Sequence, residues 1–361
     1  EARRILRRFV LRNPAAAQAY AALGEICLKA GYYETVVPAF SRATALAPTA
    51  LHHGNLAEAL SLRRAFETAE YHYHKALELA PDNPALRLNY AVHLLSQGKV
   101  REGWRAFEAR LDPRLPDAPM RTLTLPRWDG SDLDERHLLV VSEQGLGDEI
   151  RLAALLPGVE DIARSVTVEC DPRLVTLFQR SMPGIRFHAY SRIKRAGRGH
   201  YSYGWLPEED GPDCYIELGS LALRLDRPLV PPKNSGGFLR PDPGIVESLR
   251  GRLGGRKLVG LSWASGARQF GRATNYPPLE AWRDLLTLPD ASFISLQYGD
   301  AAGEVSRLSE LAGRELLQLD GLDLRSDLDS LAALAGNLDL VLSVGNATAA
   351  LSGAVGTPTV E

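Results

Sequence analysis

The chain has 361 residues, of which 45% are apolar and 24% are charged, and its formal net charge is −2. These values are typical of a globular protein with two or three domains, and the small net charge excludes a general attraction to nucleic acids. The sequence contains no run of about eighteen apolar residues, which predicts that no helix spans a membrane.

The cysteines and the chain ends bear on the cellular setting. Cys27, Cys170 and Cys214 lie far apart, without the spacing of a metal or redox site, which favours a reducing compartment. The opening residues, EARRILRRFV, hold too short an apolar run for a signal peptide. We therefore expect a cytoplasmic protein without a resident metal or cofactor. Because the chain starts in mid-pattern and stops inside an expected strand, we expect a fragment of a longer protein.

A helical repeat occupies residues 1–111. Residues 17–50 align with residues 50–83, so that Pro48 matches Pro81, and a third, partial unit follows. Small residues at matching positions let the two helices of a unit pack closely. Each proline ends a second helix because it lacks the N–H that a helix interior needs. The period of about 34 residues resembles the tetratricopeptide repeat (TPR).

Two asparagines, Asn55 and Asn89, occupy the same position of the first helix in successive units. That face lines the concave groove of a TPR array, and the arrangement is similar to the TPR arm of eukaryotic O-GlcNAc transferase. The resemblance implies that both side chains bind the backbone of an extended peptide. The alternative is that they are ordinary polar surface residues, and the first unit has Ala22 at this position.

Four histidines of the second unit lack the spacing of a metal site. Histidines two residues apart on a helix point in different directions, and no acidic or cysteine partner lies at ligand spacing. We expect surface or groove histidines that bind no metal: His52, His53, His72 and His74.

The pattern changes after the repeats. Residues 112–136 read as a linker, with several prolines. In the next region, 137–245, strand signals alternate with helix signals, which predicts a parallel sheet. The expected strands are 138–142, 166–170 and 185–189, with helices near 148–156 and 172–181. The basic segment 191–213 breaks this pattern and is expected to be a loop, either simply solvated or able to bind an acidic acceptor.

The most informative motif is the segment 138–150, LLVVSEQGLGDEI. A buried-strand signal leads into a turn with Gly145 and Gly147, and Asp148 follows where a helix begins. This order places a carboxylate at the carboxyl edge of the sheet, where open α/β sheets bind ligands. The motif lacks the third glycine of a dinucleotide fingerprint and the Gly-Lys-Ser/Thr of a P-loop. The alternative is that Asp148 only caps its helix.

The last region, 246–361, repeats the α/β pattern. A strand at 258–264 leads into a polar loop at 265–275 that contains Arg268 and Arg272. The further elements are expected to be helices at 279–288, 303–312 and 330–337, the last capped by Asp329, and strands at 293–297 and 339–344.

A second glycine-bearing turn, 345–348, precedes the last expected helix. Small residues and free N–H groups at a helix N-terminus suit an anion such as a diphosphate, although an ordinary strand–helix turn would look the same. Two consecutive Rossmann-like halves of this kind indicate the GT-B plan of nucleotide-sugar glycosyltransferases. The predicted fold class is therefore multidomain, an all-α TPR superhelix followed by an α/β GT-B pair whose second half is truncated.

Several motifs together resemble a known family, the bacterial ADP-heptose–lipopolysaccharide heptosyltransferases linked to TPR repeats. Most specific is the E-Q-G-L-G-D string, placed after W-D-G and before a D-L-V-L-S…G-T-P ending. The resemblance covers nearly the whole chain. The motifs lie at 102–110, 127–130, 143–148, 259–263, 295–297 and 340–358.

The resemblance implies a metal-independent transferase in which Asp148 is the base that deprotonates the acceptor hydroxyl. It implies that the leaving diphosphate is stabilised by Asn346, Ala347 and Thr348, with Arg268 or Arg272 as the cationic group. The other expected donor contacts are Gly145, Gly147, Ser265 and Gln297.

Two departures from the family pattern leave a second function open. Relatives often carry an acidic residue and a histidine where this chain has Gly345 and Ala350. The first hypothesis is a transferase acting on a flagellin-like protein held by the TPR arm, with a nucleotide-sugar as donor and no nucleic-acid partner. The second is a TPR adaptor with a degenerate transferase region, and a third is a lipopolysaccharide transferase.

Overall fold

The computed structural model describes residues 1–143, 145–225, 236–254, 257–265 and 276–361. The predicted contacts Arg268 and Arg272 lie outside these residues. The chain divides into two compact units. One contains Glu1–Met120 and Lys194–His200, and the other contains most of the chain from Arg121 to Glu361.

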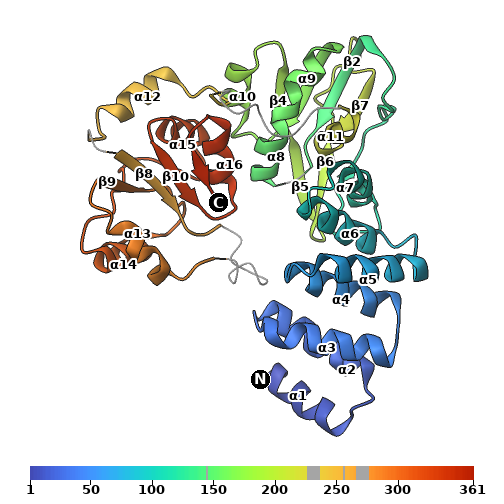
Figure 1. The fold of residues 1–361 in the computed structure, drawn as a ribbon. Helices are drawn as coiled ribbons and strands as arrows, with labels where there is room; N and C mark the ends of the chain where they lie inside the picture. The colour runs from blue at the N-terminus through green and yellow to red at the C-terminus, as the bar shows by residue number, and fades with distance from the viewer. Residues whose placement is uncertain (144, 226–235, 255–256, 266–275) are drawn as a thin grey trace. The chain divides into compact units, whose positions relative to one another are not determined.

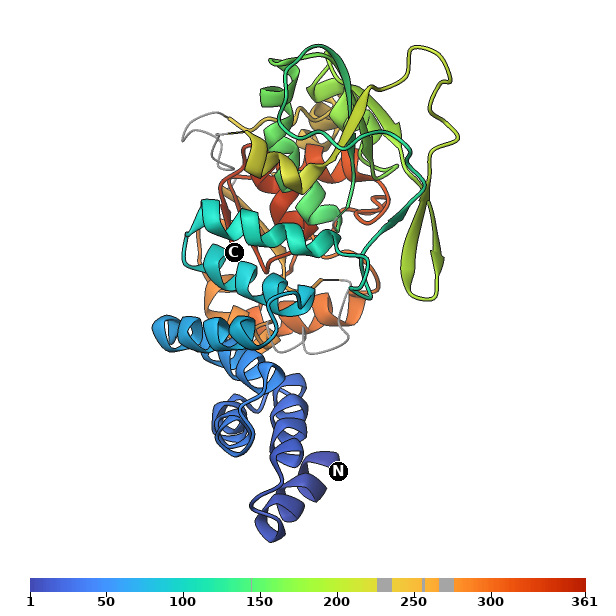
Figure 2. The ribbon, with the colours of Figure 1, turned by 90° about the vertical axis from the view of Figure 1, so that its right-hand side faces the viewer.

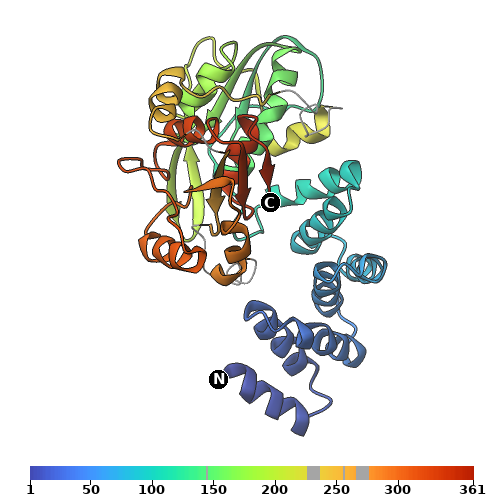
Figure 3. The ribbon, with the colours of Figure 1, turned by 60° about the vertical axis from the view of Figure 1, so that its left-hand side comes forward.

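The first unit is built from paired helices that stack one pair on the next (Figure 1, Figure 3). The close approach depends on glycine: a Cβ added to Gly24 would lie 2.4 Å from the Phe40 ring, and one on Gly54 would lie 2.3 Å from Leu86. The predicted TPR-like helical region is confirmed. Its elements are α1 (Ala2–Arg12), α2 (Ala17–Lys29), α3 (Tyr33–Leu46), α4 (Ala50–Leu62), α5 (Phe66–Leu79), α6 (Pro84–Ser96), α7 (Val100–Phe107) and η1 (Glu108–Leu111).

The first α/β half contains a parallel sheet of order β4-β3-β2-β7. Its central strand is fully buried over Leu138–Val141, as expected for a strand covered on both faces. The strands are β2 (Leu133–Val141), β3 (Ala163–Cys170), β4 (Arg186–Ala189) and β7 (Cys214–Glu217). The helices are α8 (Leu146–Leu152), η2 (Ala153–Leu155), α9 (Leu156–Glu160), α10 (Val175–Ser181), η3 (Leu218–Ser220) and α11 (Leu221–Arg224).

The prediction of a loop at 191–213 is wrong, because this segment begins with a β-hairpin of β5 (Ser191–Arg195) and β6 (Arg198–Ser202). Its turn has positive φ at both central residues, 49° at Ala196 and 82° at Gly197, as tight hairpins require. Together with β1 (Met120–Arg121) the hairpin forms a sheet of order β1-β6-β5 (Figure 2). The cluster of basic residues hid this strand signal.

The second α/β half contains a parallel sheet of order β11-β10-β8-β9. The strands are β8 (Lys257–Ser262), β9 (Ala291–Ser295), β10 (Leu340–Ser343) and β11 (Thr359–Val360). The helices are α12 (Pro243–Arg250), η5 (Leu279–Trp282), α13 (Arg283–Leu286), α14 (Ala302–Ala312), α15 (Leu328–Ala335) and α16 (Ala347–Ala354). The predicted fold class, a helical array followed by two parallel α/β halves, is confirmed.

The cap predicted for α15 is wrong. Asp327 is the N-cap, and its carboxylate accepts a hydrogen bond from the Ser330 N–H at 3.0 Å. Asp329 lies in the first turn and forms an ion pair with Arg180 of α10 at 2.7 Å. Both aspartates suit a helix start, and their different partners separate their roles. None of the described helices is long and apolar enough to cross a bilayer.

Candidate functional site

The two glycine-bearing turns meet, because the helices that follow them pack against each other (Figure 1). A Cβ added to Gly147 of α8 would lie 3.3 Å from the Cα of Ala347 at the start of α16. A Cβ on Gly145 would meet only the Asp148 carboxylate, at 3.6 Å. Of these two glycines, Gly147 is the one that the helix contact requires.

Asp148 lies exposed in the first turn of α8. The N-cap of this helix is Gly145, and no side chain forms a cap hydrogen bond, so Asp148 is not the helix cap. Its helix packs against the start of α16, and an exposed carboxylate at such a place can accept a proton from a hydroxyl group.

The residue after Asp148 is a second carboxylate with a different environment. Glu149 is 3% exposed and accepts a hydrogen bond from the Asp171 N–H at 2.7 Å. Burial raises the pKa of Glu149 to about 8, and the nearby Asp171 and Glu169 add to this effect. Sequence analysis did not single out Glu149, because Glu169 and Asp171 lie on β3 and just after it, far from Glu149 in the sequence.

A buried ion pair lies at the carboxyl end of β3. Glu169 is fully buried and accepts hydrogen bonds from Arg121 at 3.0 Å and from the Ser142 N–H at 3.2 Å. Arg121 also donates to the Tyr203 hydroxyl and lies over the Tyr201 ring. Because Ser142 directly follows the last residue of β2, Glu169 ties the start of the turn to the neighbouring strand.

The corresponding edge of the second half carries amides and hydroxyls. Asn346 caps α16 by accepting the Ala349 N–H at 3.0 Å, and its amide donates to the Ser262 hydroxyl at 2.9 Å. Gln297 accepts the N–H groups of Trp263 and Ala264, at 3.0 and 2.9 Å. Both predicted donor contacts thus hold the turn after β8.

Thr348 is the exception in this network. Its side chain is 1% exposed, and its hydroxyl has no hydrogen-bond partner among the described residues. Ala347, beside it, lies against Gly147. Ser265, another predicted donor contact, is buried and shares a hydrogen bond with the Tyr276 hydroxyl.

A cavity of about 370 Å³ opens beside Gln297, at the carboxyl end of β9. It is lined by both polar and apolar groups, among them Ser295, Tyr298, Leu322 and Asp323. Ligands of open α/β sheets bind at this end of the strands.

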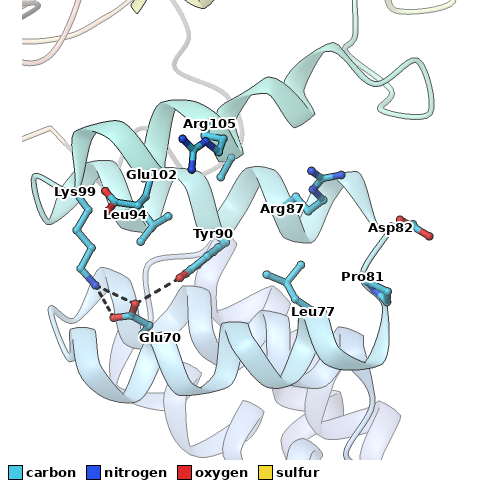
Figure 4. Close-up of a pocket in the computed structure, with 11 residues that line it drawn as sticks. Glu70, Leu77, Pro81, Asp82, Arg87, Tyr90, Leu94, Lys99, Glu102 and Arg105 are labelled. Carbon is cyan, nitrogen blue, oxygen red and sulfur yellow. Dashed lines mark hydrogen bonds and ion pairs between the residues drawn. The ribbon is translucent and has the colours of Figure 1, made fainter. Parts of the chain in front are cut away.

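We call the helices α1 to α7 the helical arm. There the Asn55 amide lies 3.5 Å from the Glu25 carboxylate, and the Asn89 amide lies 3.5 Å from the Glu58 carboxylate. A separate cavity of about 770 Å³ lies between α5, α6 and α7. There Lys99 and Tyr90 both donate to the Glu70 carboxylate (Figure 4).

The expectation of surface or groove histidines is wrong for His52 and His53, which are 5% and 9% exposed. The His52 ring pairs with the Ala47 carbonyl at 2.6 Å, and the His53 ring pairs with His72 at 2.8 Å. In the part of the chain that the structure describes, no group of three or more His, Cys, Asp or Glu side chains could hold a metal ion.

Basic residues of the 191–213 segment are partly engaged within the protein. Arg198 donates to the carbonyl oxygens of Pro113 and Pro116, at 2.5 and 3.0 Å. Arg192 lies over the Tyr190 ring, 4.8 Å from its centroid. These two residues therefore serve the fold.

Comparison with known proteins gives one curated relative and several distant structures. The chain is 33% identical to Protein FlbA of Caulobacter vibrioides, over 99% of this chain and 62% of that protein. The chain thus spans 62% of the length of the relative it matches. No family model matches.

Among solved structures, the O-GlcNAc transferase of Thermobaculum terrenum is 21% identical, with a TM-score of 0.34, over 99% of this chain and 78% of that chain. The ADP-heptose lipopolysaccharide heptosyltransferase II of E. coli is 12% identical, with a TM-score of 0.43, over 62% of this chain and 83% of that chain. Both are glycosyltransferases by name.

Proposed function

We propose that this protein transfers a sugar from a nucleotide-sugar donor to a hydroxyl group of a protein acceptor held by the helical arm. The proposal rests mainly on the contact between α8, which carries the exposed Asp148, and the N-terminus of α16, where Gly147 approaches Ala347. A base and an anion-binding helix end are the two groups that such a transfer requires at one place.

In the proposed step, the Asp148 carboxylate takes the proton of the acceptor hydroxyl as its oxygen attacks the anomeric carbon of the sugar. The bond between this carbon and the diphosphate breaks, and the electron pair leaves with the diphosphate. Asn346 caps the Ala349 N–H, and the N–H groups before it in α16 have no partner within the helix. These N–H groups would stabilise the growing negative charge. The unpartnered Thr348 hydroxyl would donate a further hydrogen bond.

The nucleoside would occupy the cavity beside Gln297. Its volume of about 370 Å³ falls in the size range of small-molecule sites. In this arrangement Gln297 acts by holding the turn after β8, through the N–H groups of Trp263 and Ala264.

The test is calorimetric titration of the protein with nucleoside diphosphates and nucleotide sugars. We expect saturable binding of one nucleotide, weakened about ten-fold by Thr348→Val, which removes the hydroxyl at nearly constant volume. Asp148→Asn should retain this binding and lose transfer. A folded protein that binds no nucleotide of the panel would refute the proposal.

A non-catalytic adaptor is the second candidate, favoured by the engagement of Asn346. Its amide and its carbonyl oxygen are both used within the protein, in hydrogen bonds to Ser262 and Ala349. Gly345 and Ala350 offer no polar side chain to replace it. An adaptor would bind a protein partner through the arm and would show no nucleotide binding in the same titration.

A further inference from the structure

The first helices of successive units, α2, α4 and α6, contact one another and form a continuous surface of the helical arm. Residues four, three and four positions apart lie on one face of a helix. On α4 this spacing selects Leu51, Asn55, Glu58 and Leu62. Leu51 and Leu62 are each 60% exposed, so Glu58 lies between aliphatic side chains that face solvent.

Carboxylates and amides alternate along this surface. The Nδ2 of Asn55 lies 3.5 Å from Glu25, and that of Asn89 lies 3.5 Å from Glu58. We call these four residues the amide–carboxylate row. Since each amide N–H is directed at a carboxylate, the row offers carbonyl and carboxylate oxygens to a partner. It is thus a surface of hydrogen-bond acceptors.

Within the row, Glu58 is a carboxylate without a cationic partner among the described residues. It is half-buried, and burial raises the pKa of its carboxyl group above the usual range. No basic side chain of the described residues forms an ion pair with it. On α2, the basic residue Lys29 follows Glu25 by four positions, so it lies beside Glu25 on the same face of that helix. A cation that pairs with Glu58 would therefore come from outside the row.

We propose that the amide–carboxylate row docks a segment of the acceptor protein in which a lysine or arginine stands next to aliphatic residues. The inference rests on the proposed function, in which the arm holds the acceptor. A basic side chain would pair with Glu58, and the aliphatic side chains would cover Leu51 and Leu62. An acidic segment would meet like charges at Glu25 and Glu58.

The test uses the full chain and two labelled peptides. In one, lysine alternates with leucine and alanine, and in the other glutamate replaces each lysine. Glu58→Gln removes the charge and keeps the shape. Glu67→Gln is the matched control, because Glu67 is exposed on α5, outside the row. Fluorescence anisotropy at low and high salt gives the dissociation constants.

We expect the lysine peptide to bind, the glutamate peptide to bind at least about ten-fold more weakly, and added salt to weaken the lysine complex. Glu58→Gln should weaken it about three-fold, as a half-buried ion pair implies, and Glu67→Gln should leave it unchanged. Equal binding of both peptides, no binding of either, or equal effects of the two variants would overturn the inference. Nucleotide titration of the parent protein separates the two proposals. A protein that binds the lysine peptide but no nucleotide refutes the transferase and keeps the docking surface, whereas a protein that binds a nucleotide but neither peptide refutes the docking surface alone.

Discussion

The two α/β halves share one plan, with a central strand that leads through a glycine-bearing turn into a helix, yet their sheet edges differ in chemistry. The first edge holds the buried carboxylates Glu149, Glu169 and Glu217. The second holds the neutral side chains of Gln297 and Asn346. Buried carboxyl groups suit proton transfer, whereas uncharged side chains at a helix N-terminus suit an anion. The difference supports the proposal that the first half carries the acceptor chemistry and the second half binds the donor.

The largest expected effect comes from breaking the buried ion pair of the first edge. Arg121→Met leaves the Glu169 carboxylate buried without its cation, which should cost about 3–5 kcal/mol of unfolding free energy. Urea denaturation measures this loss.

The control is the double variant Arg121→Met with Glu169→Gln. It removes both charges and keeps an acceptor for the Ser142 N–H. Most of the lost stability should return, because a neutral buried pair carries no unpaired charge. A double variant as unstable as Arg121→Met would show that the arginine acts through packing alone.

The pH dependence of stability should come largely from Glu149. Its pKa is near 4.5 in the unfolded chain and about 8 in the folded protein, so between these values only the folded state keeps the proton. Stability therefore falls as the pH rises through this window, by about 1.4 kcal/mol for each pH unit at most.

Glu149→Gln mimics the protonated form and should flatten this dependence. Urea midpoints measured near pH 5 and near pH 8 should differ in the parent protein and differ less in the variant. Parallel behaviour of the two proteins would mean that Glu149 does not carry the effect.

The variant Asn346→Asp places a carboxylate at the sheet edge of the second α/β half. The new carboxylate can still cap α16, but it repels a diphosphate and cannot donate to Ser262. Nucleotide affinity should fall about ten-fold, which corresponds to about 1.4 kcal/mol. Asn337→Asp is the matched control, because Asn337 also donates to backbone carbonyls but lies away from the turn. Equal losses in both variants would argue against an anion site at α16.

The smallest expected effect concerns the contact between the halves. Gly147→Ala adds a methyl group 3.3 Å from the Cα of Ala347, and it should cost about 1 kcal/mol of stability. Gly145→Ala, in the same motif, meets only the Asp148 side chain, so no backbone clash adds to the loss of the preferred N-cap glycine and the cost should be smaller. Thermal unfolding of the two variants tests the pair, and equal melting temperatures would contradict the contact.

Much of the architecture could be predicted from local patterns. The helical repeat was predictable because its contacts join neighbouring helices, and the strand 138–142 because a buried parallel strand is apolar on both faces. The hairpin at Ser191–Arg195 and Arg198–Ser202 was missed because exposed basic residues mask the alternation of a strand. The cap of α15 was misassigned because two aspartates compete for one position, and their contacts with Ser330 and Arg180 distinguish them.

The sequence by itself determined the helical repeat, most strands of the two parallel sheets and the two turns, since periodicity and glycine positions are local properties. Only the tertiary structure decided that Gly147 meets Ala347, that Glu149 is buried beside Asp171, and that Asn346 is engaged by Ser262. These contacts join residues far apart in the chain. The environment of a carboxylate or an amide depends on its neighbours in space, and no local pattern contains them.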